Sequence, residues 1–414
     1  MKRSVAGVLA VGMMAALAAC GAEREDGDPA GGGDEARMDV PLDETRYEDA
    51  VAATNALGLE MTLGQEPGEN AIVSPASLTI ALAMLAEGAV GDGDAELTEL
   101  LGLGGTDRTE AYSALTRALG AYEAGEFSVD EIPEDPFLRV ANNLVVLDGY
   151  EVKESFTDAV TGHFDATTDS ADLASQSGKD VLDAWVREQT EGLIEESAIE
   201  PDVDLRLVLQ NALLFAAQWA EPFAEAGTFP ETFVRGDGTE IDVDMMHDAL
   251  NVAFGEADGH TAIALPYNGD FIAYAVLPPE GEEPTTEGVN AAIEALGEPT
   301  LVDIALPAFD LAVETDVADQ LMQRGITAIF NDDTSLHGIA EDDLVVSAIA
   351  QQARLIVDED GTVGAAVTEI GVSATSMPII EQEFRADRPF VFLVRHEPTG
   401  IDLFTAWIND PTAE

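Results

Sequence analysis

The chain has few side chains arranged for catalysis. Its histidines stand at positions 163, 247, 260, 337 and 396, and no two have the spacing of an HExxH zinc site. Neither a GxSxG nucleophile turn nor a GxxxxGK[ST] phosphate loop occurs. Carboxylates are so numerous that a pair of them carries no information. The sequence therefore predicts no enzyme, no metal site and no cofactor.

One stretch near the C-terminus has an unusual charge pattern. Charged residues make up 24% of the chain, yet from Gly361 to Ile380 the only one is Glu369. In an extended backbone one face of this stretch is uncharged; it comprises Thr362, Gly364, Ala366, Thr368, Ile370 and Val372. Glu369 falls on the other face. The pattern predicts a strand that can enter a β-sheet while Glu369 stays in water.

The elements around this stretch can be predicted from apolar periodicity. Helical spacing or an apolar helix is found in residues 46–64, 74–91, 94–103, 107–125 and 177–194. Ser74 and Pro75 are a typical N-cap and first helical residue, and the following helix is apolar on nearly every face. Strand signals occupy 137–147, 205–219, 229–278 and 342–360, and a hairpin is expected in 388–411. Helices early and strands late favour an α+β fold.

Several long motifs resemble those of the serpin family, from about Tyr47 to Pro411. The first is NAIVSPASLTIALAMLAEGAVGDGDAEL, beginning at Asn70; the second is LVLQNALLFAAQWAEPF; the last two are FRADRPFVFLVR and LFTAWINDP. DEDGTVGAAVT resembles the hinge of the family's reactive-centre loop. The resemblance implies a serpin fold over 45–414, with a large central sheet, surrounding helices and an exposed reactive-centre loop at about 359–383.

The resemblance also assigns roles to particular residues. The loop hinge would comprise Glu359, Gly361, Thr362, Gly364, Ala365 and Ala366. The region where the sheet opens would comprise Asn70, Ser74, Ser77, Asn211, Trp219 and Gln351. Gln351 stands where the family has a histidine, and because an amide can also donate and accept, we expect Ser74, Asn211 and Gln351 to form a polar cluster where the sheet opens. Ala308 stands where the family has a lysine, so we expect the ion pair of Glu359 to be missing.

The implied function is inhibition of a serine endopeptidase by suicide cleavage, in which the cut loop inserts into the sheet. The family's usual interval puts the scissile bond at Thr375-Ser376, within a window from Val372 to Met377. This window has no Arg, Lys or aromatic residue, which favours an elastase-like or subtilisin-like target. Small hinge residues favour an inhibitor. A non-inhibitory binding protein and an inhibitor of cysteine proteases remain the alternatives.

The N-terminus and the net charge predict where the protein acts. Lys2 and Arg3 precede an apolar run, and residues 1–19 end in a lipobox-like LAA before Cys20, the only cysteine. We expect Cys20 to be lipidated and residues 20–44 to form an acidic flexible tether. The exported protein would then be anchored at the cell surface or outer membrane. Simple secretion is the alternative. The net charge of −63 argues against nucleic-acid partners. We expect a monomer.

Overall fold

The computed structural model describes residue 42 and residues 46–65, 68–123, 132–346, 349–362 and 382–413. These lie in one compact unit, Ala36–Glu414. Some residues singled out in the sequence lie outside the described ranges, namely Cys20, Gly364, Ala365, Ala366, Thr375 and Ser376.

The described part of the chain interleaves helices and strands. The helices are α1 (Tyr47–Leu63), α2 (Pro75–Ala86), α3 (Asp92–Leu100), α4 (Gly105–Gly120), α5 (Glu154–Phe164), α6 (Gln176–Gln189), α7 (Thr286–Glu294), α8 (Val317–Gln323) and α9 (Ala328–Asn331). The expected α+β class is confirmed. The helices near 46–64, 74–91, 94–103, 107–125 and 177–194 are present, whereas α5, α7, α8 and α9 were not predicted.

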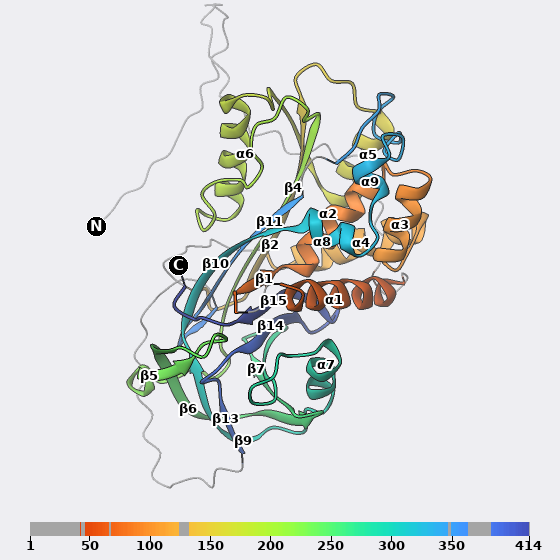
Figure 1. The fold of residues 1–414 in the computed structure, drawn as a ribbon. Coiled ribbons are helices and arrows are strands. Elements are labelled where there is room, and N and C mark those ends of the chain that lie inside the picture. Colours follow the sequence, from red (N-terminus) through yellow and green to blue (C-terminus); the bar gives the residue numbers. More distant parts are fainter. Residues whose placement is uncertain are drawn as a thin grey trace, which may run out of the picture. The chain divides into compact units, whose positions relative to one another are not determined.

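A six-stranded sheet contains the segment that precedes the uncharged stretch. Its strands, in spatial order, are β10 (Phe309–Asp316), β11 (Ala350–Val357), β12 (Gly361–Thr362), β4 (Leu207–Gln218), β2 (Phe137–Leu147) and β3 (Thr167–Ala171). The ladders of β12 with β11 and with β4 are antiparallel, so β4 and β11 run parallel to each other. Helix α2 contacts β4 on one face, and α6 contacts it on the other (Figure 1).

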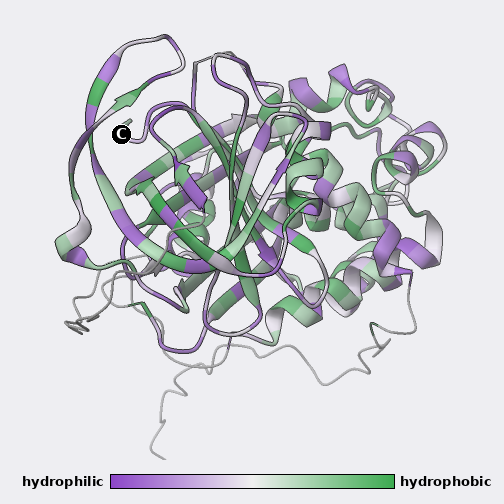
Figure 2. Ribbon diagram, turned by 90° about the horizontal axis from the view of Figure 1, so that it is seen from below, coloured by the Kyte–Doolittle hydropathy of each residue, from purple (hydrophilic) through white to green (hydrophobic). Residues whose placement is uncertain are grey.

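A second sheet has nine strands. Its path is β1 (Ala71–Val73), β15 (Ile401–Ile408), β14 (Phe390–His396), β8 (Phe271–Leu277), β7 (His260–Pro266), β6 (Glu240–Ala257), β9 (Thr300–Pro307) and β13 (Gln382–Arg385), with β5 (Phe229–Val234) paired to β6. The hairpin expected in 388–411 is formed by β14 and β15. In Figure 2 green segments are frequent on the strands in the middle of the view, and purple is more frequent on the surrounding loops.

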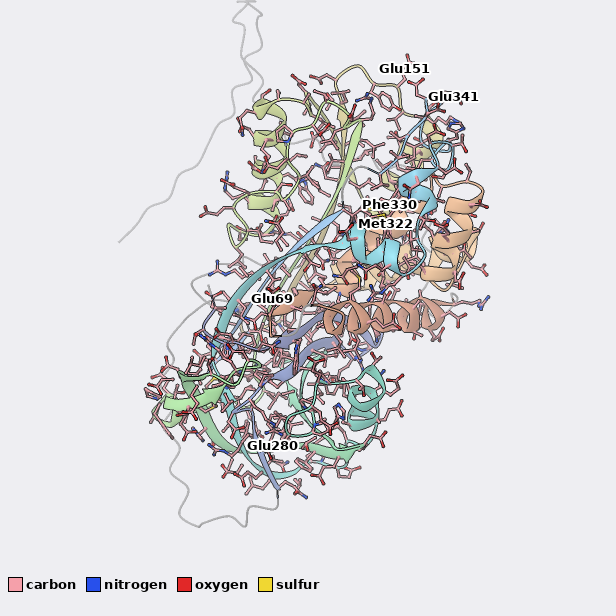
Figure 3. All side chains as sticks on the ribbon, viewed as in Figure 1. Glu69, Glu151, Glu280, Met322, Phe330 and Glu341 are labelled. Carbon is pink, nitrogen blue, oxygen red and sulfur yellow. The ribbon has the colours of Figure 1, made fainter. Side chains whose placement is uncertain are left out.

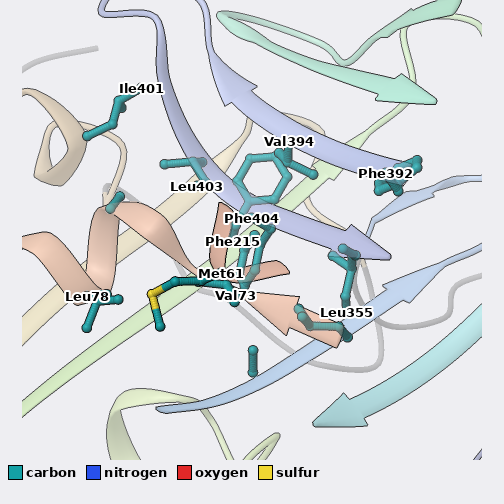
Figure 4. Packing of buried hydrophobic residues seen from close by; sticks show 14 of the residues in the cluster. Met61, Val73, Leu78, Phe215, Leu355, Phe392, Val394, Ile401, Leu403 and Phe404 are labelled. Carbon is teal, nitrogen blue, oxygen red and sulfur yellow. The ribbon is translucent and has the colours of Figure 1, made fainter. Parts of the chain in front are cut away.

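Helix α2 lies in the core between the two sheets. Every residue of α2 except Ala81 is buried, as its all-round apolar sequence predicts. Leu78 of this helix belongs to one buried cluster with Phe215 of β4 and Phe404 of β15 (Figure 4). The helix therefore couples the six-stranded sheet to the nine-stranded sheet.

The acid excess lies on the outside of the fold. Figure 3 labels Glu69, Glu151, Glu280 and Glu341, of which Glu151 and Glu341 stand at its upper edge, and all four are exposed. Within the described residues no helix combines the length and apolarity needed to cross a bilayer, and no three His, Cys, Asp or Glu side chains gather as a metal site would require.

One ion pair is buried in the nine-stranded sheet. Arg395 donates to the two carboxylate oxygens of Asp402 at 2.6 and 3.2 Å, and Asp402 is 1% exposed. The Arg395 guanidinium lies 5.2 Å from the ring centre of Tyr274. The backbone N–H of Asp402 donates to Asn55 of α1 at 2.9 Å. The pair therefore ties the β14–β15 hairpin to α1.

We expect Asp402→Asn to lower the free energy of unfolding by about 3–5 kcal/mol, because it leaves the Arg395 charge without its buried partner. Asp310→Asn is the matched control. Asp310 pairs with Arg354 at 2.7 Å on the surface, where such pairs contribute less than about 1 kcal/mol. Denaturant unfolding checks both variants, and equal losses would show that burial of the Arg395 pair does not matter.

Candidate functional site

The candidate site is a slot in the six-stranded sheet between β4 and β11. Among the described residues these strands are linked only through the two-residue β12, which pairs Gly361 with Gln218 and Thr362 with Ala217. The rest of β4, residues 207–216, has no described strand partner on that side. A cavity of about 200 Å³ lies there, lined by both strands and by α2. At β12 the gap between β4 and β11 is one strand wide, and beyond β12 the cavity lies between the two strands.

Trp219 holds the hinge turn at the closed end of the slot. Its indole Nε1 donates to the carbonyl oxygen of Asp358, and its backbone N–H donates to that of Asp360, both at 2.9 Å. The backbone N–H of Phe223 donates to the carbonyl oxygen of Glu359, also at 2.9 Å. Three successive carbonyl groups of the hinge are thus fixed to the end of β4.

Two further contacts fix the direction in which β12 points. The Thr362 hydroxyl is completely buried and lies 2.6 Å from the Tyr267 hydroxyl, whose ring stacks on Trp219 at 4.3 Å. Burial raises the pKa of Tyr267, so its hydroxyl stays protonated. Gly361 sits so close to β4 that an added Cβ would lie 2.2 Å from the Ala217 carbonyl oxygen. Only glycine fits at this point.

Polar side chains line the slot below the hinge on both sides. Gln351 of β11 exchanges two hydrogen bonds of 2.9 Å with the backbone N–H and carbonyl of Ser74. On the other side the Ser77 hydroxyl contacts Asn211, whose Nδ2 donates to Asn142 at 2.6 Å. Ser74, Ser77, Asn211 and Gln351 all line the cavity. The three residues of the expected polar cluster thus border one cavity, in which Gln351 bonds with the backbone of Ser74 while Asn211 bonds with Ser77 and Asn142.

Ser74 does not cap α2 with its side chain. Its hydroxyl is buried and has no hydrogen-bond partner among the described residues, and it borders the cavity. Asn70 lies away from the slot. Its amide bonds with the backbone of Asn409 and Asp410 at 2.7 to 2.9 Å and ties the end of β15 to the start of β1.

Sequence reasoning missed two residues of the site. The pair Asn142-Asn143 in the middle of a mostly apolar strand is a signal for Asn142, because buried amides in a strand need partners. Tyr267 gave no local signal, since it follows β7 and reaches Trp219 only through the tertiary fold.

The hinge turn concentrates negative charge. Asp358 is partly buried, and its carboxylate accepts from the backbone N–H groups of Asp360 and Gly361. Burial raises the pKa of Asp358, and the charge of Glu359 adds to the rise, while those hydrogen bonds oppose it. Burial and then the charges of Asp358, Glu225 and Glu359 raise the pKa of Asp360. Glu359 has no basic group within ion-pair distance among the described residues.

We expect Asp358→Asn to weaken the dependence of stability on pH. Because the pKa of Asp358 is raised in the folded protein, protonation of its carboxyl group stabilises the docked hinge. This contribution to stability is complete below the ordinary Asp pKa of about 4, and it is lost as the pH rises through the raised pKa of the folded state. The neutral amide of the Asp358→Asn variant keeps this stabilising contribution at every pH. The melting temperature of the variant should therefore exceed that of the parent by the largest amount near pH 7. Thermal unfolding between about pH 4 and pH 7 measures the difference.

Asp237→Asn is a control of opposite sign. The Thr239 hydroxyl and backbone lower the pKa of the exposed Asp237, so its contribution is present at neutral pH and lost in acid. The melting temperature of this variant should lie below that of the parent near pH 7 and should approach it in acid. The same pH trend in both variants would contradict the assignment of raised pKa to the hinge.

Comparison with known proteins supports one family. Residues 53–411 match the model of the family described as serpin (serine protease inhibitor). The chain is 30% identical over 378 residues to Iripin-8 of Ixodes ricinus, covering 86% of this chain and 92% of that protein. It is 29% identical over 393 residues to an uncharacterized serpin-like protein of Methanosarcina mazei, with 90% of each covered.

Solved structures agree with the family match. Human thyroxine-binding globulin, in complex with its ligand, matches with a TM-score of 0.75 at 25% identity, covering 90% of this chain and all of that one. The thermophilic serpin Tengpin in its native state matches in fold with a TM-score of 0.75 at 21% identity, covering 88% and 93%. With a family match across most of its length and the serpin fold confirmed, this chain belongs to the serpin family.

Proposed function

We propose that this serpin inhibits serine proteases by inserting its cleaved loop into the slot between β4 and β11. The main support is that β12 already begins an antiparallel strand between the parallel strands β4 and β11, which have no described ladder with each other. Open strand edges favour addition of a further strand. The hinge residues Gly361 and Thr362 would be its first two residues.

The register of β12 defines how far insertion would extend. Continuing from Thr362 opposite Ala217 by one residue at a time, Val372 comes opposite Leu207, the first residue of β4. Residues 363–372 would thus fill the whole length of the slot. The proposed scissile bond, Thr375-Ser376, follows shortly after this segment and would reach the far end of the sheet with it.

Side-chain chemistry supports this register. Thr362 points inward to Tyr267, so Gly364, Ala366, Thr368, Ile370 and Val372 would also face the cavity floor. Thr368 would come opposite Asn211, beside the polar groups that line the slot. This inward face would bury small, apolar or hydroxyl side chains and no charge.

Glu369 would meet a different environment from the water expected from the sequence. It would pair with Gln210, which is 6% exposed and donates to the Leu182 carbonyl oxygen of α6. This face of β4 is covered because α6 lies across it. Helix α6 would therefore have to shift when the carboxylate of Glu369 enters.

The proposed mechanism begins as ordinary proteolysis. The protease serine Oγ attacks the Thr375 carbonyl carbon, the Thr375-Ser376 bond breaks, and Ser376 leaves as a free amine while Thr375 becomes an ester. The freed loop then inserts and carries the esterified protease along the sheet before water can hydrolyse the ester. Buried side chains contribute roughly 25 cal/mol per Å² of apolar surface, in addition to the new backbone hydrogen bonds.

Target preference follows from the loop sequence. The window 372–377 contains small and apolar residues and no Arg, Lys or aromatic side chain. We infer an elastase-like or subtilisin-like target. The similarity to the protein named leukocyte elastase inhibitor of Sus scrofa, 29% over 377 residues, is consistent with this preference.

Incubation with elastase or subtilisin should give a complex that survives SDS, and cleavage in the loop should strongly raise the melting temperature. Ala366→Arg should form no complex and should be cleaved as a substrate, because a guanidinium cannot enter the slot opposite Leu213. Ala366→Ser, which is small, is the matched control and should still inhibit.

Two results would contradict the proposal in different ways. Clean loop cleavage by every serine protease tested, with no rise in melting temperature, would indicate a non-inhibitory binding protein, as thyroxine-binding globulin binds thyroxine. A complex formed only with cysteine proteases would retain the mechanism and change the target class.

We also propose that Cys20 is the lipidated N-terminus of the exported protein and that residues 20–44 tether the inhibitor to the cell surface or outer membrane. Support comes from the lipobox-like residues before Cys20. Cys20→Ser should release the protein from the membrane fraction into the soluble fraction. Unchanged membrane association of this variant would refute the anchor.

A further inference from the structure

We propose that Phe229 and His247 form a platform that binds a basic side chain of the target protease; this rests on the proposed inhibitory function. The large hydrophobic residues exposed in the described structure are Val90, Val203, Phe229, Val234 and Val345. Phe229 is the aromatic one among them and is 45% exposed. It lies at the start of β5, on the edge of the nine-stranded sheet.

The ring of Phe229 is held in a defined orientation. It stacks on the imidazole of His247 with the centroids 4.6 Å apart and the planes 3° from parallel. The Glu231 carboxylate lies beside the imidazole, with one oxygen 3.5 Å from His247 Nε2. Its other oxygen lies 2.7 Å from Arg385. One side of the Phe229 ring is therefore supported, and a large part of the residue faces solvent.

The platform lies close to the end of the reactive-centre loop. Strand β13 begins at Gln382, and its Arg385 pairs with Ala305 of β9, which in turn pairs with His247 of β6 (Figure 1). His247 is two strands from Arg385, or about 10 Å. A protein partner typically covers about 800 Å² of each surface. A protease bound to the loop would therefore extend over β5.

The surroundings of the ring select a cation. Glu231 of β5 lies on the same face as Phe229, and Glu225 precedes β5, while Asp242, Asp244 and Asp248 of β6 lie on the opposite face of the same hairpin. The nearby Arg235 and Arg385 are each held by a carboxylate, Asp410 and Glu231. An exposed aromatic face amid negative charge attracts Arg or Lys by a cation–π contact, and the same field speeds the approach of a basic surface. The partner group is thus a basic side chain beside the substrate cleft of the protease.

The test measures the second-order rate of complex formation with elastase and subtilisin at low salt. Phe229→Ser should slow the rate about two- to five-fold, with an unchanged melting temperature and stoichiometry. Phe229→Lys should slow it further, because it opposes like charges. Phe229→Tyr keeps the ring and should match the parent. Val203→Ser is the matched control and should leave the rate unchanged. Val203 is also an exposed hydrophobic residue, and it lies just before β4, at the end of that strand away from the hinge.

Three outcomes distinguish the possibilities. Equal rates for Phe229→Ser and the parent, on every protease that the parent traps, would refute the platform and leave the inhibitory function intact. A Phe229→Lys rate equal to or above that of Phe229→Ser would refute a basic partner group. Absence of any trapped complex with the parent protein would refute the proposed function itself.

Discussion

The hydrogen bonds between Trp219 and the hinge turn are the constraint on which the rest of the site depends. They fix the carbonyl groups of Asp358 and Asp360 to the end of β4, and Tyr267 fixes Thr362 from below. Because the turn occupies the gap between β4 and β11, these strands are separated at this end of the sheet. The cavity below them follows directly from this separation.

An open sheet of this kind stores free energy. The edge of β4 from Leu207 to Ala216 has no described strand partner on the slot side, and unpaired backbone groups are costly where water is excluded. Helix α2 supplies polar contacts to both rims, through Ser74 to Gln351 and through Ser77 to Asn211. A polar group lies on each side of the opening because each rim needs hydrogen bonds while the strand between them is missing.

Local patterns in the sequence predicted part of this arrangement. The all-round apolar helix α2, the long strands β2 and β4 and the β14–β15 hairpin follow from periodicity, and the family motifs led to Trp219, Asn211 and Gln351. Helix α7 was missed although Thr285 caps it by accepting from Gly288 N–H. Tyr267 and the position of Asn70 could not be predicted, because their contacts join segments far apart in the chain. Pairing across such distances leaves no periodic signal in either segment.

Amide hydrogen exchange before and after cleavage of the loop tests the central claim most directly. If the loop fills the slot, peptides covering residues 207–216 and 350–356 should become strongly protected after cleavage, because both edges gain hydrogen bonds. The control is the surface hairpin of β5 and β6, which should not change. Unchanged exchange in β4 and β11 after complete cleavage would contradict the claim that this opening receives the loop.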